Sequence, residues 1–159
     1  MSPLPFRRRG RLPQQLMPQA ARLAWPLAGR LAETIGPRLA GAYVLYLEEE
    51  GPMGMARLRD WALDRLADLL TAPARACPHT AQGSALPIVA CAWQGALSCA
   101  DAPCLAQMTA LPEGDERQRC DGCRRIGGDA PTAVIVASGG ALLLARLCPA
   151  CRMELIANP

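Results

Sequence analysis

The last third of the chain carries two Cys-x-x-Cys pairs separated by two apolar runs. The pairs are Cys120 with Cys123 and Cys148 with Cys151. Residues 132–138 and 141–147 flank a Gly-Gly dipeptide, which is the pattern of a β-hairpin. A hairpin returns the second pair to the first, so four thiolates can surround one ion. Such a set predicts a closed tetrahedral zinc site. Iron is the alternative, because four thiolates suit either ion.

A second candidate site lies upstream and follows a similar plan. Its four ligands are Cys77, His79, Cys99 and Cys104. A proline eight residues after the opening pair introduces an apolar run at 88–93, a glycine turn follows, and the return strand ends at a cysteine. The same order of ligands and turns in both halves predicts an internal repeat and a second zinc ion. Cys91 lies within the first strand and is expected to be a small buried residue, with a role as a ligand left as the alternative.

In each copy the last cysteine begins a short apolar segment with a proline in its first turn, which predicts a short helix. A knuckle, a hairpin and a helix that supplies the last ligand resemble the treble-clef and zinc-ribbon class of zinc finger. The resemblance spans residues 77–157 and concerns ligands and plan, not one particular family. It implies structural zinc in tandem modules.

The residue types argue against an enzyme. Four protein ligands leave no coordination position for water, whereas catalytic zinc keeps one open. The chain contains one histidine and no lysine, so no histidine remains for a nucleophile triad if His79 binds metal. Gly127-Gly128 and Gly139-Gly140 are typical of turns rather than of a phosphate-binding loop.

The formal charge of +3 is concentrated at the N-terminus. Six of the 17 basic residues, all of them arginine, precede the first acidic residue, Glu33, so the rest of the chain carries 11 arginines against 14 acids. The body of the protein is therefore not a uniformly basic nucleic-acid binder. Eight cysteines without a convincing export signal favour metal over disulfides. No apolar run approaches the roughly 20 residues that span a bilayer, so we expect a cytoplasmic protein with no membrane partner.

We expect an α+β chain, with an N-terminal helical segment followed by two small zinc-bound β-hairpin modules. The predicted divisions are a flexible basic arm (1–15), a helical region (16–76), a first zinc module (77–112) and a second zinc module (113–159). Helical periodicity covers 16–35, where Pro26 should kink or divide the helix, and 53–70. Residues 39–50 are also predicted as helix, with a strand over 43–47 as the alternative. Met55, Leu58, Ala62, Leu66, Leu69 and Leu70 are expected on the buried face of the helix at 53–70.

Two functions remain open. The first is a non-enzymatic protein-interaction or adaptor module with structural zinc, because both strands at 132–147 are apolar on both faces. The first hairpin, the helices or a partner must cover the second face, and packing of the two repeats against each other is expected to cover most of it. The alternative is a zinc-containing nucleic-acid-binding or transcription-regulatory protein. It rests on an arginine-rich arm that could contact phosphates, and on Arg124 and Arg125 after a knuckle. The arm's arginines are Arg7, Arg8, Arg9 and Arg11.

Overall fold

The computed structural model describes residues 19–46, 56–81 and 87–157, which combine helix and sheet as predicted. The strands are β1 (Ala42–Tyr46), β2 (Arg75–Ala76), β3 (Ile88–Cys91), β4 (Ala96–Ser98), β5 (Thr132–Ser138) and β6 (Ala141–Leu147). The helices are α1 (Gln19–Ile35), α2 (Ala56–Thr71), α3 (Pro78–Ala81), α4 (Ala102–Met108) and α5 (Pro149–Arg152). Single helical turns at Gly36–Arg38 and Gly114–Gln118 are of the 3-10 type, and a π turn at Met153–Ala157 follows α5.

All six strands belong to one sheet, in the order β1-β5-β6-β3-β4-β2. Each expected hairpin forms, and the strands at 132–138 and 141–147 have the predicted bounds. The hairpins then join through a parallel pairing of β3 with β6, in which Ile88 lies opposite Ala141 and Cys91 opposite Leu144. The two hairpins therefore share a sheet instead of forming two separate modules.

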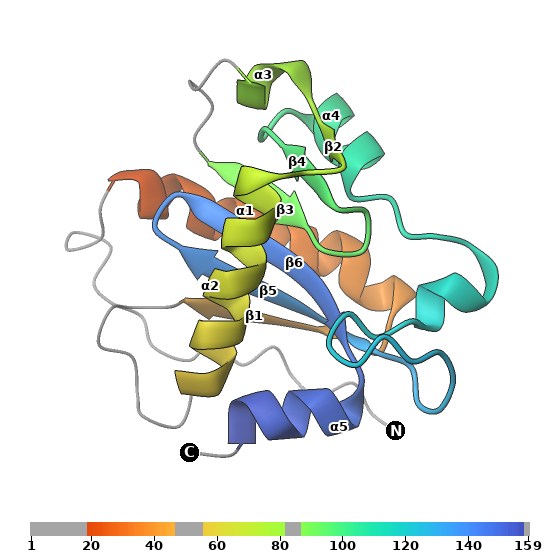
Figure 1. The fold of residues 1–159 in the computed structure, drawn as a ribbon. Coiled ribbons are helices and arrows are strands. Elements are labelled where there is room, and N and C mark those ends of the chain that lie inside the picture. The colour runs from red at the N-terminus through yellow and green to blue at the C-terminus, as the bar shows by residue number, and fades with distance from the viewer. Residues whose placement is uncertain (1–18, 47–55, 82–86, 158–159) are drawn as a thin grey trace.

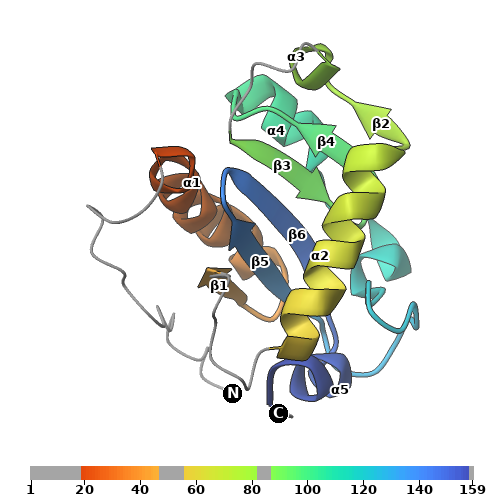
Figure 2. The ribbon, with the colours of Figure 1, turned by 60° about the vertical axis from the view of Figure 1, so that its left-hand side comes forward.

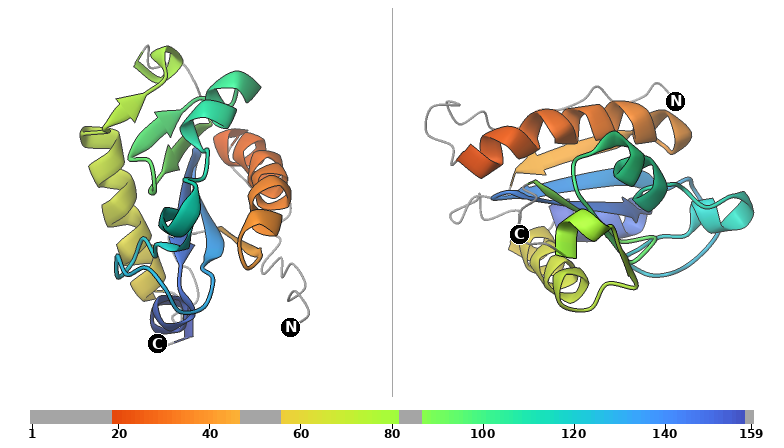
Figure 3. Two further views of the ribbon diagram at one scale, coloured as in Figure 1. Left: turned by 90° about the vertical axis from the view of Figure 1, so that its right-hand side faces the viewer. Right: turned by 90° about the horizontal axis from the view of Figure 1, so that it is seen from above.

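The sheet is the middle layer of three, with α1 on one face and α2 on the other (Figures 1, 2 and 3). Alternate residues of β5 serve the two faces: Ile135 packs in the cluster with α1, and Val134 and Val136 pack in the cluster with α2. This arrangement explains why the strands are apolar on both sides. α1 and α2 therefore cover the two apolar faces of strands β5 and β6.

Within the segment predicted as helix at 39–50, the described residues form a turn at 39–40 and then strand β1, which agrees more closely with the alternative of a strand over 43–47. β1 pairs in parallel with β5, with Val44 opposite Ile135, and becomes one edge of the sheet. Val44 and Leu45 are buried on opposite faces of the sheet, toward α1 and α2 respectively. Partners far away in the sequence thus decided the conformation of an ambiguous apolar run.

The two long helices correct the sequence expectations in detail. α1 continues through Pro26 without being divided, and Pro26 lies on its exposed side. The face of α2 that packs on the sheet carries four of the six predicted residues: Leu58, Ala62, Leu66 and Leu69. Leu70 is 46% exposed, so its placement on that face was wrong. Met55 and the basic arm at 1–15 lie outside the described residues.

Among the helices of the described residues, none combines the length and the apolar character that crossing a bilayer requires.

Candidate metal centres

Among the described residues, two groups of side chains bring four potential ligand atoms within 4.8 Å of one another. They are the two sets that the sequence singled out. Cys120, Cys123, Cys148 and Cys151 are called here the four-cysteine cluster, and Cys77, His79, Cys99 and Cys104 are called the histidine cluster. All eight cysteines are free thiols, so no disulfide competes with metal for them.

Secondary structure places each thiol of the four-cysteine cluster. Cys120 and Cys123 flank a turn that precedes β5, Cys148 caps the N-terminus of α5, and Cys151 lies within that helix. The Sγ atoms of Cys123 and Cys148 are 4.0 Å apart. Sulfurs about 3.8 Å apart are expected for a tetrahedral ion with zinc–sulfur bonds of about 2.3 Å. The spacing therefore fits a four-coordinate ion of this size.

Backbone N–H groups point at the sulfurs of this cluster. Gly122 and Cys148 each donate a hydrogen bond of 3.3 Å to Sγ of Cys120, and Cys151 donates one of 3.5 Å to Sγ of Cys148. Donors of this kind stabilise thiolate, the form that binds metal. Gly122 also has a steric role, because a Cβ atom there would lie 3.2 Å from Sγ of Cys151.

The thiols of the four-cysteine cluster differ in their readiness to ionise. A hydrogen bond from the backbone of Arg125 is the main cause that lowers the pKa of Cys123 to about 7. Burial raises the pKa of Cys120, and burial together with the neighbouring sulfurs raises the pKa of Cys151 well above the usual range. Four thiolates at this distance need a compensating positive charge, which a metal cation supplies.

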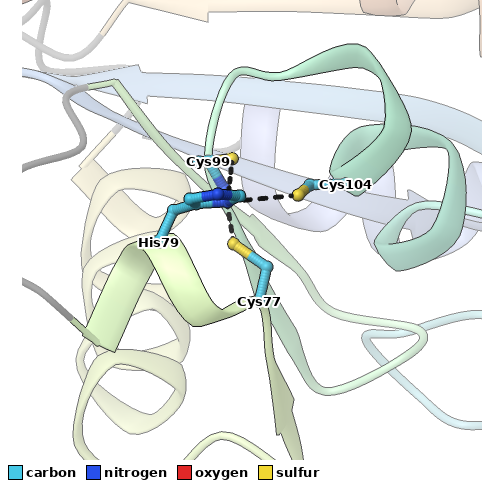
Figure 4. Close-up of side chains that lie close together, drawn as sticks. All are labelled: Cys77, His79, Cys99 and Cys104. Atoms are coloured by element: carbon cyan, nitrogen blue, oxygen red, sulfur yellow. Dashed lines mark hydrogen bonds between the residues drawn. The ribbon is translucent and has the colours of Figure 1, made fainter.

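The histidine cluster is assembled from four different places in the fold. Cys77 follows β2, His79 lies in α3, Cys99 follows β4 and Cys104 lies in α4. Nδ1 of His79 is 3.5 Å from Sγ of Cys99 and 3.4 Å from Sγ of Cys104, and the ring faces the sulfurs (Figure 4). Nitrogen and sulfur ligands of one tetrahedral zinc ion are expected about 3.5 Å apart. This geometry also fits one ion.

Hydrogen bonds set the acidity of two thiols in the histidine cluster. Burial opposes ionisation of Cys77, but backbone N–H donors, including that of Cys99 at 3.2 Å, outweigh it and lower its pKa to about 6. The pKa of Cys104 is raised to about 11, chiefly by its hydrogen bond to Cys99. At neutral pH Cys77 therefore ionises readily, whereas Cys104 needs a nearby cation to lose its proton.

The two clusters lie at opposite ends of the sheet. The histidine cluster includes the residue after β4, and the four-cysteine cluster includes the residue after β6. β4 is antiparallel to β3, and β3 is parallel to β6, so β4 and β6 run in opposite directions and finish at opposite ends. Figure 1 accordingly shows α3 and α4 at one end of the molecule and α5 at the other. Each cluster joins the segment before a hairpin to the segment after it.

Cys91 belongs to neither cluster. It is fully buried in β3, and burial is the main cause that raises its pKa far above the usual range. The prediction of a buried core residue is confirmed, and the alternative in which Cys91 replaces a ligand is not supported, because the four atoms within reach come from the other set.

Sequence reasoning missed one pair of charged residues beside the four-cysteine cluster. Asp121 lies inside the first knuckle, Arg146 lies in β6, and their side chains are 0% and 2% exposed. Arg146 is the one charged residue within the apolar run 141–147, a signal that could have indicated a buried partner.

The residues suggested for nucleic-acid contact are only partly covered by the structure. Arg7, Arg8, Arg9 and Arg11 lie outside the described residues. Arg124 and Arg125 follow the Cys120/Cys123 turn and are exposed, and Arg124 has a positive φ of 66°.

Comparisons of the chain with protein-family models, with curated proteins and with solved structures find no match. The two clusters of potential metal ligands are therefore the features from which a function can be inferred.

Proposed function

We propose that the protein is a non-enzymatic zinc protein in which two structural zinc ions fasten the ends of an α/β/α sandwich that serves as a protein-interaction module. The observation that carries this proposal is the pair of closed four-ligand clusters, each with all its ligand atoms within 4.8 Å. Three thiolates with one imidazole are a zinc set, and the shared plan of the two clusters favours zinc over iron in both.

A structural role suits what the clusters connect. The four-cysteine cluster links a turn before β5 to α5, and the histidine cluster links α3 to α4 across a hairpin. α3 has four residues, and a helix this short needs external support. The order of knuckle, hairpin and ligand-bearing helix supports zinc modules of the treble-clef or zinc-ribbon type.

The interaction role rests on the outer face of α2. Leu63, Ala67 and Leu70 are exposed and are spaced so that they share one side of the helix, away from the residues packed on the sheet. Leu63 and Leu70 are 40% and 46% exposed. An apolar stripe on an otherwise charged helix is the kind of surface that a protein partner covers.

Metal analysis tests the zinc part of the proposal. Protein purified without added metal should contain two zinc equivalents per chain, and Cys120→Ser should remove one because it removes a ligand from one cluster only. Cys91→Ala is the matched control and should retain both ions, since Cys91 belongs to neither cluster. Metal-free wild-type protein, or a red iron protein, would contradict the zinc assignment.

Affinity capture tests the interaction part. Leu63→Ser combined with Leu70→Ser should abolish recovery of a partner that wild-type protein recovers, because the stripe loses its apolar surface. Arg57→Ser, an exposed change on the same helix, should leave recovery intact. Equal recovery by all three proteins would exclude the α2 stripe as the binding surface.

A zinc-containing nucleic-acid-binding or transcription-regulatory protein is the second candidate. The exposed Arg124 and Arg125 beside the four-cysteine cluster favour it, because guanidinium groups bind phosphate. If these arginines contact phosphate groups, the affinity for nucleic acid should fall as the salt concentration rises. The arm at 1–15 contains four further arginines whose contribution to that affinity can be measured in the same way.

A further inference from the structure

Asp121 and Arg146 form a buried ion pair beside the four-cysteine cluster. Nη2 of Arg146 donates to Oδ1 of Asp121 at 2.9 Å, and Nε donates to Oδ2 at 3.2 Å, so the guanidinium grips both oxygens. The side chains are 2% and 0% exposed. Burying two charges is costly unless their geometry is good and their remaining hydrogen bonds are made.

The surrounding groups make those remaining bonds. Nη1 of Arg146 donates to the backbone carbonyl of Glu116 at 2.7 Å. The guanidinium also lies over the ring of Trp93, with Cζ 5.5 Å from its centroid. Trp93 belongs to the turn of the other hairpin, and its Nε1 donates to the carbonyl of Ala110. Arg146 is thus held from three directions, by Asp121, by the carbonyl of Glu116 and by Trp93.

The pair also joins the two Cys-x-x-Cys knuckles through the backbone. Asp121 follows Cys120 directly, and Arg146 precedes Cys148 by two residues. The N–H of Asp121 donates to the carbonyl of Arg146 at 2.7 Å, and the N–H of Arg146 donates to Oδ2 of Asp121 at 2.6 Å. Next to these bonds, the N–H of Cys148 donates a hydrogen bond to Sγ of Cys120. The two knuckles are therefore fixed side by side by the same two residues.

We propose that Asp121 and Arg146 are positioning residues of the four-cysteine cluster, which hold its two knuckles at metal-binding separation and so raise its metal affinity. The inference rests on the proposed metal binding by that cluster. It predicts an effect on one cluster only, since no hydrogen bond of either residue reaches a ligand of the histidine cluster among the bonds described for them. General stabilisation of the fold would act on both clusters.

Cobalt(II) titration resolves the two clusters within one molecule, because cobalt with four thiolates and cobalt with three thiolates and an imidazole absorb differently. Asp121→Asn keeps the shape of the side chain but removes its charge. It should weaken cobalt and zinc binding at the four-cysteine cluster about 10- to 100-fold, the range typical of residues that orient metal ligands. Affinity at the histidine cluster should remain that of the wild type.

Asp129→Asn is the matched control, an identical change at an exposed carboxylate between the same knuckle and β5, and it should leave both affinities unchanged. If Asp121→Asn does not fold, Arg146→Lys serves instead. Lysine keeps the charge but cannot donate to both carboxylate oxygens of Asp121 and also to the carbonyl of Glu116. The same selective loss of metal affinity at the four-cysteine cluster is therefore expected.

Two results would overturn the proposal: unchanged affinity at the four-cysteine cluster, or an equal loss at both clusters. Failure of the metal assignment itself is distinguishable, because wild-type protein would then show no thiolate–cobalt band from the four-cysteine cluster before any substitution is made.

Discussion

Cys91 and the ligand cysteines have the same side chain in different surroundings. Cys91 is fully buried in β3, and burial keeps its thiol protonated by raising its pKa. Cys123 is exposed and accepts a hydrogen bond that lowers its pKa to about 7. Burial alone does not separate a core cysteine from a candidate ligand, because Cys120 is also buried and its pKa is also raised. What distinguishes the candidate ligands is that three other ligand atoms lie within 4.8 Å of each sulfur.

We predict that Cys91 resists alkylation in the folded, metal-loaded protein, even at pH 9. A raised pKa means that the reactive thiolate forms only above that pKa, so raising the pH from 7 to 9 should not make Cys91 reactive. Mass spectrometry after iodoacetamide treatment measures this directly. In urea with a chelator, the control, Cys91 should be modified as fast as the other cysteines. Equal modification in the folded protein would show that β3 does not shield Cys91 from solvent.

At the scale of elements, the knuckle 120–123 depends on Gly122 for its close approach to α5. A Cβ atom at this position would meet Sγ and Cβ of Cys151 and Cδ2 of Leu147 at 3.2–3.3 Å. These atoms belong to a ligand and to a fully buried leucine, so none of them can move away freely. A larger residue at position 122 would therefore displace the turn from α5.

We predict that Gly122→Ala weakens zinc binding at the four-cysteine cluster by about 10-fold or more, because the added methyl group separates the knuckle from Cys151. Chelator competition monitored with cobalt measures the effect. Gly29→Ala in α1 is the control, since its new Cβ meets no atom within 4 Å, and it should leave metal affinity unchanged. Wild-type affinity in Gly122→Ala would show that the turn can shift at no cost.

At the scale of the whole molecule, the sheet interleaves segments that are far apart in the chain. β1 pairs with β5, β3 with β6 and β2 with β4. The buried residues of α1, from Ala24 to Ile35, pack with β5 and β6. The N-terminal helices and the cysteine-rich half therefore bury each other's apolar surface, and neither retains its core alone.

We predict that removing both metal ions destabilises the molecule in a single cooperative transition. Hydrogen exchange measured by mass spectrometry should show α1 and β5 losing protection together, because structural zinc supplies roughly 10–16 kcal/mol in small modules and the two elements share one core. Protein that is chelated and then reloaded with zinc is the control. Retained protection of α1 after protection of β5 is lost would indicate two independent folding units.

We predict that deleting residues 1–15 flattens the salt dependence of any DNA binding by about 3–4 units of log–log slope, since each phosphate contact contributes about 0.9. Filter binding across a salt series measures the slope. Replacing Arg7, Arg8, Arg9 and Arg11 with glutamine keeps the length of the arm and should have the same effect. An absence of DNA and RNA binding by full-length protein at about 50 mM salt would eliminate the nucleic-acid candidate, because phosphate contacts are strongest at low salt.

The sequence by itself determined the features that depend on short-range spacing. The eight candidate ligands, the strands at 132–138 and 141–147 and the helix that became α2 follow from local patterns of cysteine, glycine and apolar residues. Each hairpin brings its own ligands together, so the local sequence is enough to predict both ligand sets.

Only the tertiary structure decided how these pieces combine. The parallel pairing of β3 with β6, the strand conformation of β1 and the cover that α1 and α2 give to the two sheet faces all depend on contacts between distant residues. The same holds for Asp121 and Arg146, which are 25 residues apart and whose charges are stable in the interior only because the fold brings them together. Local propensity does not predict such pairings, because contacts between distant residues stabilise the protein only when folding has brought those residues together.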